Sequence, residues 1–345
     1  PKRQEAMNKE LMAIEKNNTW QLTDLPKGHK AIDVKWVYKI KVKANGEIDR
    51  YKARLVAKGF EQREGYDYEE IFSPVARMET VRLIIALAAQ RQWKIHQMDV
   101  KSAFLNDPLD EEVYVKQSSG FIQSGKEEKV YILTKALYGL KQAPRAWNKR
   151  IDSFLHATGF KKCASDHGLY VKTNDYGDLL ILCLYVDDVI FTGSNLKMIG
   201  DFKHIMMKEF EMTDLGLMSY FLGIEVIQGD DGIFIHQRKF ATEFLKKFKM
   251  EDSNSVKTPI ETGIKLTKEG DGRTVDATYF KQIVGSLRYL TCTRPDICYV
   301  VGLVSRYMES PRQVHLQVVK RIMRYIKGTT TFGLFYSSSK KIEIV

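Results

Sequence analysis

The chain has 345 residues, 44% of them hydrophobic, which suits a globular protein with a sizeable core and two or three domains. Its 54 Lys and Arg outnumber its 43 Asp and Glu, and the formal net charge of +11 favours a polyanionic partner, most simply nucleic acid, over a merely basic soluble protein. No apolar run is long enough to span a bilayer, and the four cysteines show neither a CxxC pair nor zinc spacing, so we expect no membrane partner and a reducing compartment. The chain begins at Pro1 without a Met, from which we expect a piece of a longer product.

The first part of the chain predicts a polar helix followed by a basic hairpin. Residues 1–20 are polar, with Leu11 and Ile14 as the apolar positions of the expected helix. Residues 31–59 have strand composition on both sides of Asn45-Gly46, a strong hairpin-turn signal. These strands carry basic residues that either contact phosphates or form a solvated face, namely Lys35, Lys39, Lys41, Lys43, Arg50, Lys52, Arg54 and Lys58.

Helical and strand patterns then alternate. The apolar stripe of residues 78–92 predicts a helix, and the stretch around Trp93 to Val100 predicts a strand that ends in Asp99. A second helix is expected over residues 143–160, with Pro144 at its start and Gly159 as its stop. A strand is predicted at residues 168–172.

The apolar stretch LLILCLYVDDVIFTG, residues 179–193, is interrupted by Asp187 and Asp188. We expect two strands, about 179–186 and 189–193, with both aspartates at the bend, and Cys183 in the core. Ionised carboxylates beside an apolar stretch cost free energy unless something compensates them, and Mg²⁺ held by one or two carboxylates would do so. A solvated turn is the alternative. Asp99 is the natural third carboxylate for a two-metal site.

The remaining pattern completes an α+β protein. Residues 195–210 predict an amphipathic helix, residues 221–237 a hairpin that turns at GDDG, and residues near 239–249 another helix. Residues 251–276 are polar, contain Gly263, Gly270 and Gly272, and are interpreted as a linker. Three helices are expected between Thr278 and Lys327, and the final stretch suggests two strands cut short.

At this point the sequence resembles a known family. Tyr185-Val186-Asp187-Asp188 is similar to the YxDD motif of reverse transcriptases, and the chain looks like the polymerase of a copia-type long-terminal-repeat retrotransposon. The resemblance spans nearly the whole chain. It is carried, in order, by KARLVAKGFEQREGYDYEEIFSPVARMETVR, QMDVKSAFLN, ALYGLKQAPRAW, LYVDDVIFTG, DLGLMSYFLGIEV and GSLRYLTCTRPDI followed by SRYMESP and a His.

The resemblance implies a right-hand polymerase with fingers, palm and thumb, a ferredoxin-like palm and a helical C-terminal region. The domains that it implies are a lead-in (1–19), fingers and palm (20–260), a linker (261–276), a helical thumb-like or connection-like region (277–330) and the start of a truncated ribonuclease H-like domain (331–345).

The resemblance also implies site residues. Asp99, Asp187 and Asp188 would be the catalytic carboxylates and, with the carbonyl of Val100, the metal ligands, with Asp188 the less secure direct ligand. The nucleotide-binding residues that it implies are Lys52, Arg54, Phe104, Gly139, Gln142 and Tyr185. In this comparison Phe104 lies under the incoming sugar, one of Lys52 and Arg54 reaches the triphosphate, and the primer-gripping hairpin carries Phe221, Leu222 and Gly223. The structural alternatives are core packing for Phe104, Tyr185, Phe221 and Leu222, and a plain turn for Gly139.

By the same resemblance the cofactor is a pair of Mg²⁺ ions, with Mn²⁺ as a substitute. The partners are a primer on an RNA or DNA template, deoxynucleoside triphosphates, and the integrase and ribonuclease H parts of the same polyprotein. The expected location is the cytoplasm, within virus-like particles.

Two departures from the family pattern leave an alternative open. Asp107-Pro108 stands where the family usually has Gly after Asn, and Ser118 stands where Pro is expected. The alternative to an active polymerase is therefore a decayed remnant that binds nucleic acid, and a two-metal nuclease is a third reading. The chain stops where the family begins its ribonuclease H domain, so we expect no ribonuclease H activity.

Overall fold

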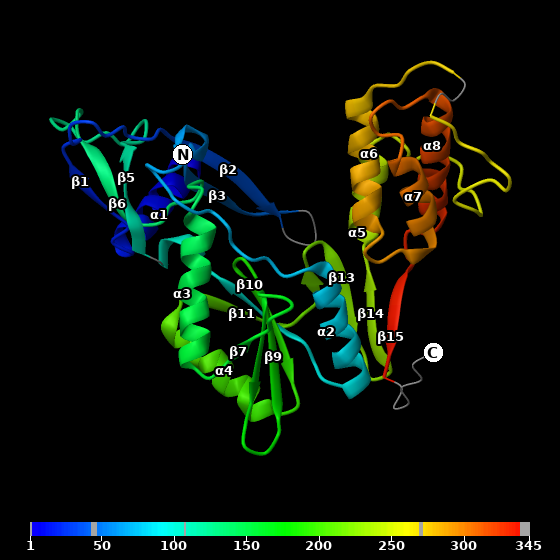
Figure 1. Ribbon diagram of the computed structural model, residues 1–345, viewed down its shortest axis with the longest axis horizontal. Coiled ribbons are helices and arrows are strands. Elements are labelled where there is room, and N and C mark those ends of the chain that lie inside the picture. Colours follow the sequence, from blue (N-terminus) through cyan, green and yellow to red (C-terminus); the bar gives the residue numbers. More distant parts are fainter. Residues whose placement is uncertain (1, 43–46, 107, 269–271, 339–345) are drawn as a thin grey trace. The chain divides into compact units, whose positions relative to one another are not determined.

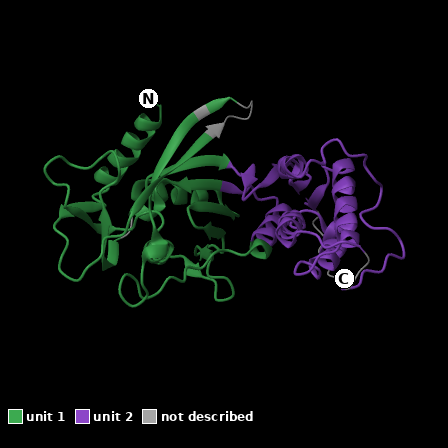
Figure 2. Cartoon of the chain, turned by 90° about the horizontal axis from the view of Figure 1, so that it is seen from above, with its two compact units in different colours: residues 1–80, 97–216 green, residues 81–96, 217–345 purple. Residues whose placement is uncertain are grey.

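The computed structural model describes residues 2–42, 47–106, 108–268 and 272–338, which fold as a mixed helix-and-strand protein in the order shown in Figure 1. Two compact units divide the chain: residues 1–80 with 97–216, and residues 81–96 with 217–345 (Figure 2). The predicted turn at Asn45-Gly46, Asp107, Gly270 and the last seven positions lie outside the described residues. The structure confirms the part of the predicted α+β class that it tests, namely that helices and strands occur together.

The predicted helices are present with slightly different ends. The helices are α1 Lys2–Lys16, α2 Met78–Arg91, α3 Ala143–Ala157, α4 Leu196–Glu209, α5 Arg238–Lys247, α6 Ala277–Leu290, α7 Cys298–Ser305 and α8 Gln313–Gly328. Short 3₁₀ turns occupy Gly59–Glu61, Ala103–Asn106 and Pro295–Ile297. Gly159, just after α3, has φ +90°, the left-handed conformation that ends many helices.

The strands form four sheets within the described residues. Their bounds are β1 Trp20–Thr23, β2 Val34–Val42, β3 Ile48–Ala57, β4 His96–Val100, β5 Pro108–Lys116, β6 Val130–Lys135, β7 Lys161–Lys162, β8 Leu169–Thr173, β9 Leu179–Tyr185, β10 Asp188–Gly193, β11 Met212–Leu217, β12 Tyr220–Phe221, β13 Ile224–Gln228, β14 Gly232–His236 and β15 Gly333–Ser337. The sheet orders are β1-β6-β5, β11-β4-β10-β9-β8-β7, β12-β13-β14-β15 and β2-β3.

The sheet that contains β9 and β10 carries the core of the first unit. Helices α3 and α4 present apolar stripes to one of its faces, because apolar residues recur three and four positions apart along each helix. The buried side chains of this cluster include Trp147, Ile151 and Leu155 from α3, Ile199, Phe202 and Met206 from α4, and Leu180, Leu182 and Leu184 from β9. Cys183 is also fully buried, as predicted.

Helix α1 and the hairpin of β2 and β3 form another part of the first unit. Along β3, Ala53, Leu55 and Ala57 are buried, whereas Lys52 and Arg54 alternate with them and therefore share the opposite face. Ile14 of α1 packs in the same cluster as Leu55 and Ala57. Burial of the apolar face of β3 thus leaves its Lys and Arg side chains on the opposite face of the hairpin.

In the second unit a buried cluster joins α5, α6, α7 and α8. The described part of the segment 251–276, expected to be a linker, forms no helix or strand. Its Val256, Ile260, Ile264, Leu266 and Val275 pack against this cluster. The described part of the final stretch forms β15, which pairs antiparallel with β14.

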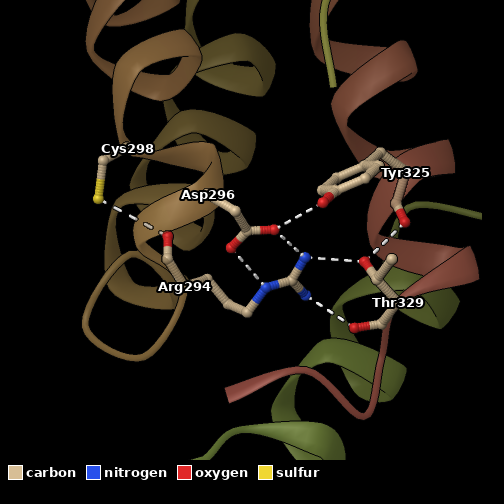
Figure 3. Close-up of polar contacts among 5 residues, drawn as sticks. All are labelled: Arg294, Asp296, Cys298, Tyr325 and Thr329. Carbon is tan, nitrogen blue, oxygen red and sulfur yellow. Dashed lines mark hydrogen bonds and ion pairs between the residues drawn. The ribbon is translucent and has the colours of Figure 1, made fainter. Parts of the chain in front are cut away.

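A buried network of hydrogen bonds surrounds the C-terminal end of α8 (Figure 3). Arg294 is only 3% exposed and donates two hydrogen bonds to Asp296, at 2.9 and 2.7 Å, and two to Thr329, one to its carbonyl and one to its hydroxyl. The Tyr325 hydroxyl donates to the same Asp296 carboxylate at 2.9 Å. Because a buried charge is costly without partners, these bonds give Arg294 and Asp296 of the TRPDI block a structural role.

Candidate active site

The strand order places the three predicted catalytic aspartates on neighbouring strands and the turn between them. Strand β4 lies directly beside β10 in the sheet, so Asp99, next to the end of β4, and Asp188, the first residue of β10, are on neighbouring strands. The main-chain N–H of Val100 donates a 2.9 Å hydrogen bond to the main-chain oxygen of Asp187. This bond ties the end of β4 to the loop between β9 and β10.

The turn between β9 and β10 has the predicted length of two residues but lies one residue earlier than predicted. Tyr185 pairs with Asp188, which leaves Val186 and Asp187 as a two-residue turn. The expectation that both aspartates lie in the bend is therefore wrong for Asp188, because the ladder of β9 and β10 extends to it. Val186 has φ +57°, a strained value for a β-branched residue, and the indole N–H of Trp147 donates a 2.6 Å hydrogen bond to its carbonyl.

The acidic residues interact through their charges. The pKa of Asp188 is raised to about 6, mainly because burial disfavours its ionised form. A hydrogen bond of 3.2 Å from the Gln97 side-chain amide opposes this shift, whereas the negative charges of Asp187 and Asp99 add to it. A cation next to Asp188 would offset this unfavourable environment.

The donor set fits a hard divalent cation in its chemistry, since carboxylate oxygens are the ligands that Mg²⁺ takes. Within the described residues, however, no group of three or more His, Cys, Asp and Glu side chains is gathered closely enough to hold a metal ion. The described side chains thus supply carboxylates on neighbouring strands, without a closed ligand cage.

A ring and a guanidinium group lie near these carboxylates. The Phe104 ring meets the Tyr138 ring edge-on with centroids 5.0 Å apart, and Phe104 is half-buried. The Arg54 guanidinium lies 4.6 Å from the centroid of the same Tyr138 ring. Burial raises the pKa of the Tyr138 hydroxyl, Arg54 lowers it in part, and the charge of Asp187 raises it again, which places Tyr138 within electrostatic reach of both residues.

Glu10 of α1 interacts electrostatically with Arg54. Its side chain is 9% exposed, and its Oε1 atom has no hydrogen-bond partner within the described part of the chain. Burial raises the pKa of Glu10, and the charge of Arg54, the main-chain N–H of Leu55 and the charge of Lys52 each lower it in part. Arg54 therefore interacts with an acidic neighbour from α1 as well as with the Tyr138 ring.

Gly139 and Gln142 hold the segment that precedes α3. Gly139 has φ +91°, and a Cβ built on it would overlap the carbonyl of Ala57, so no other residue fits there without a shift. The Gln142 side chain is 2% exposed, accepts a 3.0 Å hydrogen bond from Gln62 and donates one of 2.9 Å to the carbonyl of Asp67. The buried amide therefore holds this segment through both its oxygen and its nitrogen.

The expected primer-gripping residues lie in the second unit. Phe221 is 2% exposed and pairs with Ile224, so Leu222 and Gly223 form the two-residue turn between β12 and β13. Tyr185, in the first unit, is half-buried at the end of β9.

Sequence reasoning did not assign four residues of this neighbourhood: Glu10, Gln97, Tyr138 and Trp147. Gln97, Tyr138 and Trp147 fall inside the sequence blocks that carry the family resemblance, and this position could have marked them as site residues. No pattern marks Glu10, because one acidic residue in a polar helix is ordinary.

Comparison with known proteins decides the family. The model of the family "Reverse transcriptase (RNA-dependent DNA polymerase)" matches residues 17–262. The chain belongs to this family. The predicted resemblance to copia-type reverse transcriptases is confirmed by relatives among transposon polyproteins.

Three relatives illustrate the similarity. The chain is 40% identical over 346 residues to the retrovirus-related Pol polyprotein from transposon TNT 1-94 of Nicotiana tabacum, covering 98% of this chain and 26% of that protein. It is 38% identical to the corresponding polyprotein from transposon RE1 of Arabidopsis thaliana, with 98% and 23% covered. It is 33% identical over 249 residues to a putative transposon Ty5-1 protein of Saccharomyces cerevisiae, with 72% and 80% covered. The chain thus spans about a quarter of the two polyproteins.

None of the helices in the described ranges is long and apolar enough to cross a membrane.

Proposed function

We propose that this reverse-transcriptase chain is an RNA-directed DNA polymerase that extends a primer on an RNA or DNA template by two-metal phosphoryl transfer. The observation that carries the proposal is that β4, with Asp99, lies beside β10, which begins at Asp188, and that Val100 bonds to Asp187 in the turn before it. In the proposed division, the sheet with β4, β9 and β10 is the palm, α1 with β2 and β3 belongs to the fingers, and the helical cluster of the second unit is the thumb.

Asp99 and Asp187 would hold two Mg²⁺ ions, with the Val100 carbonyl as a further oxygen ligand and Asp188 in a less direct role. Such ions would activate the attacking oxygen of the primer and neutralise the phosphates of the nucleotide. One carboxylate oxygen of Asp188 already accepts a hydrogen bond from the Gln97 side-chain amide, which suits a supporting role. The strained Val186 turn presents Asp187 at the tip of the hairpin.

The nucleotide would lie between the carboxylates and the basic face of β3. Arg54 is the better candidate for the triphosphate than Lys52, because Arg54 is the one stacked over Tyr138, next to Phe104. Phe104 would contact the sugar. The net charge of +11 supports a phosphate-rich partner.

The second candidate is a decayed remnant that binds nucleic acid without chemistry. Ser118, one of the two departures from the family pattern, is 4% exposed, and its carbonyl accepts a hydrogen bond from Phe121 N–H at 3.0 Å, so it is accommodated in a turn. Asp107, the other departure, lies outside the described residues. The intact set of three carboxylates favours the polymerase.

A primer-extension assay on poly(rA)/oligo(dT) with Mg²⁺ separates the candidates. The polymerase incorporates deoxynucleotides, the remnant binds without incorporation, and a nuclease shortens the primer. Asp187→Asn should lower extension by several powers of ten, each tenfold being about 1.4 kcal/mol of barrier. Asp99→Asn should behave alike.

Asp201→Asn, the same change at an exposed position of α4, is the matched control and should leave extension unaltered. Near-normal extension by Asp187→Asn would remove the carboxylates from the mechanism.

A further inference from the structure

The turn between β12 and β13 has a backbone that needs support. Phe221 pairs with Ile224, and the two residues between them have positive φ, +48° at Leu222 and +80° at Gly223. Positive φ at both central residues is the geometry of the type I′ hairpin turn, which suits glycine and is disfavoured for leucine. The surroundings must therefore stabilise the conformation of Leu222.

Helix α6 supplies that support through Tyr289. The Tyr289 hydroxyl donates a hydrogen bond to the carbonyl oxygen of Leu222. A Cβ built on Gly223 would overlap the same hydroxyl, and the ring atom Cζ would lie 3.2 Å from it. One side chain thus holds the Leu222 carbonyl and requires a glycine at the next position.

The Tyr289 ring is itself held firmly. It meets the Phe240 ring of α5 edge-on with centroids 4.6 Å apart, and its neighbours in the helix, Leu287 and Leu290, are 0% and 1% exposed in the helical cluster. Because α6 is anchored by this cluster, the position of the hydroxyl is set by the helices and not by the hairpin.

A hydrogen bond to the Leu222 carbonyl also sets the plane of the peptide between Leu222 and Gly223, since a peptide group is planar. The direction of the Gly223 N–H and the placement of the turn follow from that plane. Without the hydroxyl, the Leu222 carbonyl would lose its hydrogen bond from α6, and the peptide would be freer to rotate.

We propose that Tyr289 is a positioning residue that holds the Leu222–Gly223 turn in the conformation that receives the primer end. This inference rests on the proposed function, in which Phe221, Leu222 and Gly223 grip the primer. Tyr289 acts through the turn and does not itself touch the substrates.

The test compares Tyr289→Phe with Tyr279→Phe, the same change on the same helix. The contact recorded for Tyr279 within the described chain is with the Phe248 ring, so its hydroxyl serves as the control. Equilibrium binding is measured with a fluorescein-labelled DNA primer on an RNA template, in Ca²⁺ buffer without nucleotides, and with a blunt duplex of equal length. Melting temperatures verify that each variant is folded at the assay temperature.

We expect Tyr289→Phe to raise the Kd for the recessed primer end at least about tenfold while the Kd for the blunt duplex and the KM for deoxynucleotide change less than about twofold. Tyr279→Phe should match the wild type in all three. An equal loss on both duplexes, or none on either, would overturn the proposal.

A double-mutant cycle gives an independent readout. Gly223→Ala should weaken primer binding less in the Tyr289→Phe background than in the wild type, because the overlapping hydroxyl is absent there; additive effects would contradict the proposed contact.

These outcomes separate the two proposals. If the wild type binds the recessed primer but fails to extend it, the proposed polymerase function is wrong. The Kd values of the wild type and Tyr289→Phe still decide whether Tyr289 positions the turn. If the wild type does not prefer the recessed end, the role of Tyr289 is overturned, whatever the extension assay gives.

Discussion

The indole Nε1–H of Trp147 donates a 2.6 Å hydrogen bond to the main-chain oxygen of Val186, the residue that carries the positive φ in the turn before Asp188. Trp147 is 1% exposed and lies on α3, whereas Val186 lies between β9 and β10. A helix side chain therefore stabilises the strained turn that presents the carboxylates. Strained backbone of this kind persists only where surrounding contacts fix it.

Trp147→Phe tests this support. The change keeps an aromatic ring but leaves the Val186 carbonyl without its donor, so we expect the free energy of unfolding to fall by about 1–3 kcal/mol. Primer extension should fall at least about tenfold in protein that is still folded, because the turn is released. Urea unfolding and kcat measure the two effects. Trp20→Phe, whose ring stacks on Tyr131 with centroids 4.2 Å apart, is the control, and an equal loss of kcat there would contradict the prediction.

The pH dependence of stability reports on Asp188. Its pKa is raised from 3.8 to about 6, so its contribution is fully present below about pH 4 and is lost as the pH rises through about 6. After allowance for its partial exposure, the loss is about 1–2 kcal/mol. Urea unfolding in EDTA at pH 4.5 and 7.5 should therefore show Asp188→Asn gaining stability, relative to the wild type, at the higher pH. A difference between the variants that is the same at both pH values would refute the assignment.

Lys52 and Arg54 share one face of β3 but differ in their contacts. Arg54→Ala should raise the KM for deoxynucleotide at least about tenfold with a primer–template Kd within about threefold, because Arg54 lies over Tyr138 near the carboxylates. Lys52→Ala should have a smaller effect on nucleotide use. Steady-state kinetics and anisotropy binding measure both. Equal losses of KM and Kd would instead mean that these residues are backbone contacts for the template.

A substitution of Phe104 tests whether this residue selects deoxynucleotides over ribonucleotides. An apolar pocket rejects an added hydroxyl by only about 100-fold, and a rigid ring against C2′ would add a steric term. Phe104→Val should raise ribonucleotide use relative to deoxynucleotide use at least about tenfold, or about 1.4 kcal/mol. The ratio of kcat/KM for the two sugars measures it, with the melting temperature recorded alongside. An unchanged ratio in a destabilised protein would leave Phe104 as a core residue packed on Tyr138.

Local patterns predicted most of the helices and hairpins, because period and turn chemistry are properties of neighbouring residues. The helical stripe of α3, the strands β9 and β10 and the hairpin of β13 and β14 are examples. The sheet β1-β6-β5 was not predicted. Strand β5 has the sequence PLDEEVYVK, and its acidic residues hide the strand pattern because burial is limited to Val113, Tyr114 and Val115.

The sequence by itself determined the family, through six ordered blocks, and it predicted which three carboxylates form the site. Only the tertiary structure decided what surrounds them. That β4 lies beside β10, that Trp147 bonds to Val186 and that Tyr289 bonds to Leu222 all join residues 39 or more positions apart. Such contacts depend on how sheets and helices pack, and no local period or turn signal encodes them.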